Sequence, residues 1–294
     1  MYYQTTFQGN QLPEKSNISC FSYDTKANDS FPLHCHSYYE LSYVIHGTRY
    51  ETFNGIPYKI TDGSLFFIPP FIVHSNQNTT DVTDLVLQFT QPFLQSNGPG
   101  VSSILTLPTK AGMLPYSVIE KDSKVENLLL SLASLCKEQK DPVNIQKYSL
   151  NEELSLEWKQ RSLLLSLLSQ LVDEKQLTFQ TEETDFSQLQ QLDIVMNYIL
   201  SHPDEKLDMK TAAHMSGISY YHFSRLFQSV TGFSYTQYCN ILRIRHAESL
   251  LLNTSMSIAW ISNAIGIEST SYFTRLFKQI TGMAPLSYRN QYKH

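Results

Sequence analysis

The sequence has little cysteine, no long apolar run and no leader-like start, and each shortage excludes a class of protein. Its 294 residues include four cysteines, without the spacing of a disulfide framework or a zinc site: Cys20, Cys35, Cys136 and Cys239. The richest apolar run, residues 163–172, is interrupted by serine and glutamine and is too short to span a bilayer. The first residues lack the basic, apolar and small-residue order of a signal peptide. We therefore expect a cytoplasmic protein, in a reducing compartment, with no membrane role.

Charge is scarce and unevenly distributed. The net charge of −5 argues against nucleic-acid binding by the chain as a whole. Residues 1–186 carry thirteen Lys and Arg against twenty-one Asp and Glu, a net −8, whereas residues 187–294 carry nine against six, a net +3. The length suits two domains, and any contact with phosphate is expected from the second.

A ten-residue segment occurs twice in that second part. Residues 223–232 have the sequence FSRLFQSVTG and residues 273–282 have FTRLFKQITG, with six identical positions. In both copies the apolar side chains fall at i, i+3, i+4 and i+7, which predicts one apolar face of an α-helix. An internal repeat of this kind indicates that one structural unit is used twice.

The flanks of each copy complete a helix-turn-helix pattern. A short apolar helix is predicted upstream of each copy, followed by a turn at Gly217 or Gly266. Ser219 and Ser269 are suitable N-caps for the repeated helix. In such a motif the second helix enters the DNA major groove. Residues 236–254 predict one long helix that holds the two motifs apart, so that they could contact successive major grooves about 34 Å apart.

This region resembles the AraC/XylS family of bacterial transcription regulators. The resemblance covers residues 189–289 and is most specific in IAWISNAIGIESTSYFTRLFKQITGMAPLSYR, residues 258–289. It implies that early positions of the two repeated helices contact bases: Tyr221, Ser224, Arg225, Thr270, Ser271, Thr274 and Arg275. The basic surplus adds candidate phosphate contacts: Lys210, Arg243, Arg245, Lys278 and Arg289.

The first half has the pattern of an antiparallel β-sandwich or barrel. From residue 18 to about residue 90, short segments rich in Tyr, Phe, Val and Ile alternate with Gly and Pro. His34, His36 and Glu40 share one parity, so on a strand their side chains would point to one side. Tyr38 shares this parity. Together with His74, the spacing of His34, His36 and Glu40 resembles the two cupin motifs, except that Phe71 replaces the usual glycine.

We interpret His34, His36, Tyr38, Glu40 and His74 as a binding site for a small-molecule effector such as a sugar. In metal-binding cupins the positions of His34, His36, Glu40 and His74 hold a divalent ion, which imidazole ligands suit. A metal sensor or a metal-dependent cupin enzyme is therefore the alternative. We expect no resident metal, no other cofactor and no catalysis, because a fold does not imply a function.

Two helices are predicted over residues 121–175, and the wide apolar stripe of the second favours a homodimer. Residues 178–188 are polar and acidic, which suggests a linker. The predicted division is a cupin-like sensor at 1–120, a helical dimerisation segment at 121–176, a linker at 177–188 and an all-α DNA-binding domain at 189–294.

The sequence thus predicts a cytoplasmic, sequence-specific transcription regulator with two domains, one β-rich and one all-α. The family resemblance implies an activator, with repression as the alternative. Its expected partners are promoter DNA, a small-molecule effector, RNA polymerase and a second copy of the chain.

Overall fold

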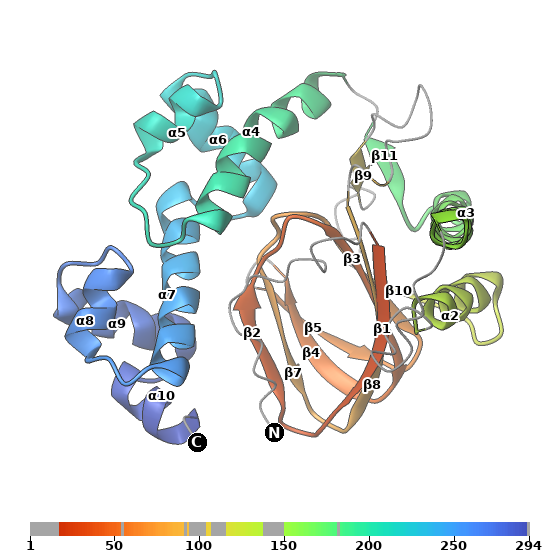
Figure 1. The fold of residues 1–294 in the computed structure, drawn as a ribbon, viewed down its shortest axis with the longest axis horizontal. Helices are drawn as coiled ribbons and strands as arrows, with labels where there is room; N and C mark the ends of the chain where they lie inside the picture. Colours follow the sequence, from red (N-terminus) through yellow and green to blue (C-terminus); the bar gives the residue numbers. More distant parts are fainter. Residues whose placement is uncertain are drawn as a thin grey trace.

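The computed structural model describes residues 18–53, 56–90, 93, 104–106, 116–137, 150–180 and 183–292. Figure 1 shows a β-sandwich with helices α2 (Lys124–Lys137) and α3 (Leu150–Asp173) on its outer side, and a separate group of helices. The predicted architecture of a β-rich domain followed by an all-α domain is confirmed.

The sandwich consists of two antiparallel sheets with the strand orders β1-β8-β3-β6-β10 and β2-β7-β4-β5. The strands of the larger sheet are β1 (Ile18–Thr25), β8 (Val82–Phe89), β3 (Tyr39–His46), β6 (Ser64–Ile68) and β10 (Tyr116–Val118). Those of the smaller sheet are β2 (Ser30–His34), β7 (His74–Asn78), β4 (Thr48–Phe53) and β5 (Ile56–Thr61).

Strand β3 shows how side-chain alternation separates the two faces of the larger sheet. Tyr39, Leu41 and Tyr43 lie in an outer core with residues of α2 (Lys124–Lys137) and α3 (Leu150–Asp173). The intervening Ser42 and Val44 contact side chains of the smaller sheet instead. The two predicted helices are therefore confirmed, and they cover the outer face (Figure 1).

The helical half contains two helix-turn-helix motifs. The first motif is α5 (Met209–Met215) and α6 (Tyr220–Thr231), and the second is α8 (Ile258–Ala264) and α9 (Thr270–Thr281). The remaining helices are α4 (Glu183–Ser201), α7 (Tyr235–Asn253) and α10 (Pro285–Tyr292). None of the described helices combines the length and the apolar character needed to cross a membrane.

Helix α7 contributes to two separate cores. Its first half, including Tyr238 and Leu242, packs in the core of the first motif. Its second half, including Ile244 and Leu251, packs in the core of the second motif. The predicted long helix is therefore the connection between both motifs.

The segment predicted as a linker, residues 177–188, is not a simple linker. Strand β11 (Thr178–Gln180) pairs with β9 (Ile104–Thr106), and α4 already begins at Glu183. Acidic composition is common to polar linkers and to helix N-termini, where it complements the helix dipole, so composition alone did not separate the two.

Candidate nucleic-acid interface and sensor site

The two repeated helices begin and end as their sequences predict. The Ser219 hydroxyl accepts a hydrogen bond from the backbone N–H of His222 at 3.3 Å, and Ser269 accepts one from Tyr272 at 3.3 Å. At the other ends Gly232 and Gly282 adopt φ values of 75° and 84°. Glycine is suited to these positions because a side chain disfavours the left-handed region.

One face of each helix is fixed to the protein core. The same positions of both copies are buried: Phe223, Leu226 and Phe227 in α6, and Phe273, Leu276 and Phe277 in α9. Both phenylalanine pairs are fully buried, which explains why phenylalanine occupies these positions in both copies of the repeat. The apolar half of the repeat is therefore a packing requirement.

The opposite face of each helix is available to a partner. In α6, Tyr221 is 79% exposed and Arg225 is exposed. In α9, Ser271 and Arg275 are exposed at the equivalent surface. The remaining candidates for base contact are half-buried: Ser224, Thr270 and Thr274. All seven candidates thus lie on α6 or α9, four of them exposed and three half-buried.

The two surfaces differ in their aromatic residues. Tyr221 packs edge-on against Tyr220 with ring centroids 5.6 Å apart. On α9 the guanidinium of Arg275 lies over the ring of Tyr272 at 5.6 Å. Such a cation–π contact orients an arginine without neutralising it.

The candidate phosphate contacts have different surroundings. Lys210 and Lys278 are exposed, in the first turn of α5 and in the last turn of α9 respectively. Arg243 is half-buried and donates to the Glu205 carbonyl at 3.4 Å, and its phosphate contact stays a prediction. Arg245 is buried and pairs with Glu248, so the phosphate contact predicted for it is wrong.

Arg289, the last candidate, donates to the carbonyls of Leu251 and Met256 at 3.2 and 2.6 Å. These bonds connect α10 to the end of α7 and to the turn before α8. The structure therefore gives Arg289 a role in holding the second motif together.

The sensor candidates converge, although not for the predicted reason. Shared strand parity would require one continuous strand, but β2 ends at His34 and β3 starts at Tyr39 in the other sheet. His34 and His74 are cross-strand partners with ring centroids 4.0 Å apart, and the His36 ring lies 5.0 Å from that of His74. The three histidines, hereafter the His cluster, present ring nitrogens within 4.8 Å of one another.

Two rings of the His cluster are held by backbone carbonyls. The Nδ1 atom of His36 lies 2.8 Å from the Tyr38 carbonyl, and that of His74 lies 3.0 Å from the Ile72 carbonyl. A carbonyl only accepts, so each Nδ1 carries the proton and each Nε2 is left as an acceptor. Burial lowers the pKa of both histidines to about 4, which keeps the rings neutral near pH 7.

These Nε2 atoms are buried and have no hydrogen bond to any described protein atom. The Oε2 atom of Glu40 lies 3.5 Å from Nε2 of His36 and accepts a hydrogen bond from Gln88 at 3.0 Å. The neutral Nε2 is an acceptor, and the neighbouring Glu40 oxygen already accepts from Gln88, so a ligand that donates a hydrogen bond or carries positive charge would suit this position. Tyr38 stacks on His36 at 4.0 Å, and its buried hydroxyl also lacks a partner among the described atoms.

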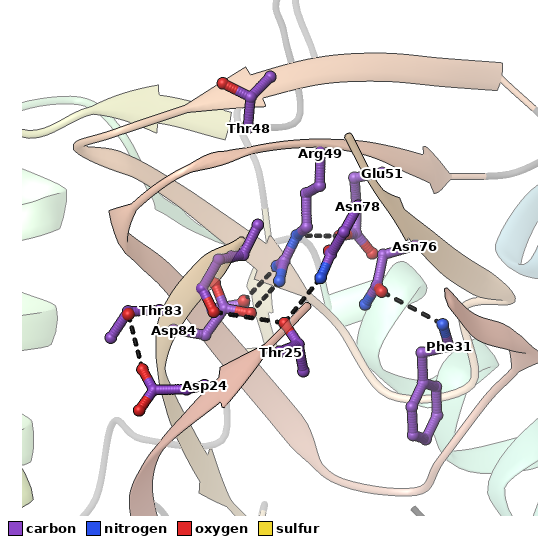
Figure 2. Close-up of polar contacts among 12 residues, drawn as sticks. Asp24, Thr25, Phe31, Thr48, Arg49, Glu51, Asn76, Asn78, Thr83 and Asp84 are labelled. Atoms are coloured by element: carbon purple, nitrogen blue, oxygen red, sulfur yellow. Dashed lines mark hydrogen bonds and ion pairs between the residues drawn. The ribbon is translucent and has the colours of Figure 1, made fainter. Parts of the chain in front are cut away.

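Figure 2 shows a buried ionic group that joins the two sheets. Arg49 of β4 pairs with Asp84 of β8 and, at 3.1 Å, with Glu51. Its guanidinium also donates to the Ser42 hydroxyl at 2.7 Å. Burial raises the pKa of Glu51 to about 8.

Sequence reasoning missed this ionic group, although a signal was present. Arg49 and Glu51 occupy alternate positions of β4, and Asn76 and Asn78 occupy the positions paired with them on β7. Polar residues at the inward parity of a predicted core strand indicate a polar interior. Together with Asp84 and Glu40, these residues make the interior polar and partly ionic.

Comparisons with known proteins agree with both halves of this description. Residues 18–172 match the AraC-like ligand binding domain family, and residues 212–291 match a helix-turn-helix domain family. The chain is 28% identical over 264 residues to the uncharacterized HTH-type transcriptional regulator YfiF of Bacillus subtilis, covering 89% of this chain and 79% of that protein. It is 24% identical over 272 residues to the HTH-type transcriptional activator RhaR of Yersinia pseudotuberculosis, covering 90% and 86%.

A solved structure shares the fold. ToxT from Vibrio cholerae O395 aligns over 94% of this chain and 98% of its own, with a TM-score of 0.57 and 15% identity. The first family match alone spans more than half of the 294 residues. The chain therefore belongs to the AraC family of DNA-binding transcriptional regulators, which are not enzymes, and combines a ligand-binding domain with a helix-turn-helix output domain.

Proposed function

We propose that this regulator activates transcription from promoters at which each subunit contacts two successive major grooves through α6 and α9. The observation that supports this is the fixed pair of recognition helices, each packed on α7 by one face and exposing an arginine on the other. Helix α7 has 19 residues, a length of about 28 Å, comparable with the groove repeat of about 34 Å. The name of the activator RhaR supports activation.

The effector in this proposal is a small hydroxyl-rich molecule, such as a sugar, bound by His34, His36, Tyr38, Glu40 and His74. The buried Nε2 atoms of His36 and His74 support this class because they are acceptors without a donor. A buried polar group without a partner costs about 1–3 kcal/mol, which a ligand hydroxyl would recover. Effector binding then changes how the dimer presents its output domains, provided the two arrangements differ in effector affinity.

A divalent metal is the second candidate effector. His34, His36 and His74 fit this role because their ring nitrogens already converge, and carbonyl-anchored Nδ1 atoms are typical of metal-ligating histidines. Glu40 would complete the set, and the bound ion would supply positive charge beside the unpartnered Nε2 acceptors of His36 and His74. Elemental analysis of protein purified without a His tag separates the candidates. Stoichiometric metal that is lost in His74→Ala selects the metal, whereas metal-free wild-type protein supports the organic effector.

We further propose a homodimer formed through α3. Three apolar side chains of this helix are exposed: Leu154 at 39%, Trp158 at 68% and Leu165 at 41%. Sedimentation at micromolar concentration should give a dimer for the wild type and a monomer for Trp158→Ser. The matched control is Trp260→Ser, which removes the other exposed tryptophan, in α8, and should stay dimeric. A monomeric wild type would refute the dimer.

Two experiments test the function itself. Genomic mapping of binding sites identifies the operator, and footprinting should then show two protected major grooves per subunit. Arg275→Ala should lose protection of one groove and keep the other. Transcription of the mapped promoter with RNA polymerase should increase on addition of the protein, whereas a decrease would establish repression. We place this action in the cytoplasm, where promoter DNA and RNA polymerase are present.

A further inference from the structure

The sensor and the first helix-turn-helix motif share one hydrophobic core. Phe71, in the turn before β7, is 8% exposed, and Val73 is fully buried, both among side chains of α4, α6 and α7. Figure 1 shows α7 running beside β2 of the sandwich. The core of the second motif contains no described residue of the sandwich. Among the described residues, the first motif but not the second therefore shares a core with the sensor.

A buried hydroxyl adds a polar connection to this contact. Tyr238 of α7 is fully buried and donates to the Phe71 carbonyl at 3.2 Å. The same hydroxyl lies 3.0 Å from the Cys35 sulfur, between β2 and β3. One side chain of the output domain thus contacts two separate loops of the sensor.

Both loops also contain or adjoin histidines of the His cluster. Cys35 lies between His34 and His36 in the chain, and Val73 directly precedes His74. In each loop the histidine faces the cluster while its neighbour faces α7. The backbone N–H of Phe71 donates to the His36 carbonyl at 2.7 Å and joins the two loops.

The backbone of Phe71 is held in an unfavourable conformation. Its φ is 67°, a region that bulky residues avoid and that persists only where the surroundings enforce it. Here the N–H and the C=O are both hydrogen-bonded and the ring is buried in the output domain. Separation of the first motif from the sensor would remove most of these restraints together.

We propose that Cys35, the Phe71 turn and Tyr238 form the contact that couples the His cluster to the position of the first motif. Occupancy of the cluster shifts the equilibrium between a first motif packed on the sensor and one released from it. Packing leaves the DNA-contacting face open, since Tyr221 stays 79% exposed, so the contact controls orientation and does not cover the face. This inference rests on the proposed effector site at the cluster.

Alkylation of Cys35 in the full chain, followed by peptide mass spectrometry, measures the packed state. Tyr238→Phe keeps the ring and leaves the Phe71 carbonyl without its donor, so iodoacetamide should modify Cys35 about tenfold faster. Loss of that hydroxyl also removes an interaction that lowers the pKa of the Cys35 thiol. The thiol itself becomes less reactive, so faster modification reports exposure.

Tyr235→Phe is the matched control. Tyr235 is also a buried tyrosine of α7, but its hydroxyl donates to the Leu207 carbonyl within the output domain at 2.9 Å. It should leave the Cys35 rate unchanged, while Phe71→Gly, which removes the ring, should raise it. Fully buried Cys20 of β1 monitors unfolding of the sandwich. Equal rates in both tyrosine variants, or acceleration of Cys20 together with Cys35, would overturn the proposal.

Coupling to the cluster is tested by a double-mutant cycle between His74→Asn and Tyr238→Phe. Each substitution changes the Cys35 alkylation rate by some factor, and the factor for the double variant should differ from the product of the two single factors. In the control cycle of His74→Asn with Tyr235→Phe, the double-variant factor should equal that product. Multiplicative factors in both cycles would overturn the inference. The cycle needs no ligand, so it tests the coupling separately from the effector site. If the factors are non-multiplicative but the cluster binds neither sugars nor metal, the coupling is upheld and only the proposed effector site is refuted.

Discussion

Two residues of one recognition helix should respond in opposite ways to substitution by alanine. Arg225 is exposed on the face assigned to DNA, whereas Phe223, two residues earlier, is fully buried. Exposed positions without special contacts usually change stability by less than about 0.5 kcal/mol, so Arg225→Ala should fold like the wild type. If the arginine contacts a guanine in bidentate fashion, its loss costs about 1–3 kcal/mol of specific binding, which is roughly a 5-fold to 150-fold change in Kd.

Phe223→Ala should instead affect folding. Replacing a fully buried phenylalanine by alanine removes apolar contact and leaves a cavity, at a cost of about 3–5 kcal/mol. Domains are stable by only about 5–15 kcal/mol, so much of the stability of the first motif would be lost. The pair Arg275 and Phe273 repeats the contrast in α9, where Phe273 is also fully buried.

Urea unfolding monitored by circular dichroism measures stability, and fluorescence anisotropy with the mapped operator measures binding. Both arginine variants should keep the wild-type unfolding midpoint and lose affinity for the operator more than for a scrambled duplex. Wild-type operator affinity in both Arg225→Ala and Arg275→Ala would show that the exposed face of the repeat does not recognise bases. An unfolding midpoint that falls in Arg225→Ala would show that this face is structural.

Three further outcomes are expected. Lys210→Ala should weaken binding to all DNA sequences alike and reduce the salt dependence of log K by about one, as measured by titration at several salt concentrations. His36 and His74 should contribute a loss of sensor stability as pH falls from 6.5 towards 4, against the opposing contribution of Glu51, whose raised pKa favours the folded state as pH falls below about 8. Burial lowers the folded-state pKa of His36 and His74 to about 4, so the unfolded chain binds protons in this window that the folded chain does not, and His74→Asn should make urea midpoints less dependent on pH. Gly282→Ala should lower the free energy of unfolding, measured by thermal unfolding, by about 1–2 kcal/mol. The cost comes from its φ of 84° alone, because a Cβ there meets no atom within 4 Å. Gly266→Ala should cost more, because its Cβ would lie 3.1 Å from the Asp204 carbonyl oxygen.

The recognition helices were predictable from sequence because their determinants are local. A cap, an apolar face of period 3.6 and a closing glycine all lie within about fifteen residues of one another. Ser219, Phe223 and Gly232 therefore have the positions in the structure that the repeat predicted. The basic residues show the limit of such reasoning, since Arg245 and Lys278 each directly follow an apolar residue in a helix, but Arg245 is buried and Lys278 is exposed.

The sensor was predictable as a class of fold but not in its interior. Alternating segments predicted strands, yet the partner of each strand depends on contacts between distant residues. The pairing of Arg49 with Asp84 joins β4 to β8 in different sheets, and no local pattern specifies it. His36 lies in the connection between β2 and β3, which belong to different sheets, so strand parity does not determine where its side chain points.

The sequence by itself determined that this chain has two helix-turn-helix motifs, which helix faces are buried and which half can approach DNA. Those properties follow from periodicity, capping and charge, which act between near neighbours in the chain. Only the tertiary structure decided that the Phe71 turn packs into the first motif and that Tyr238 bonds to the sensor. The physical reason is that burial and hydrogen bonding between residues 167 positions apart depend on how two folded domains meet.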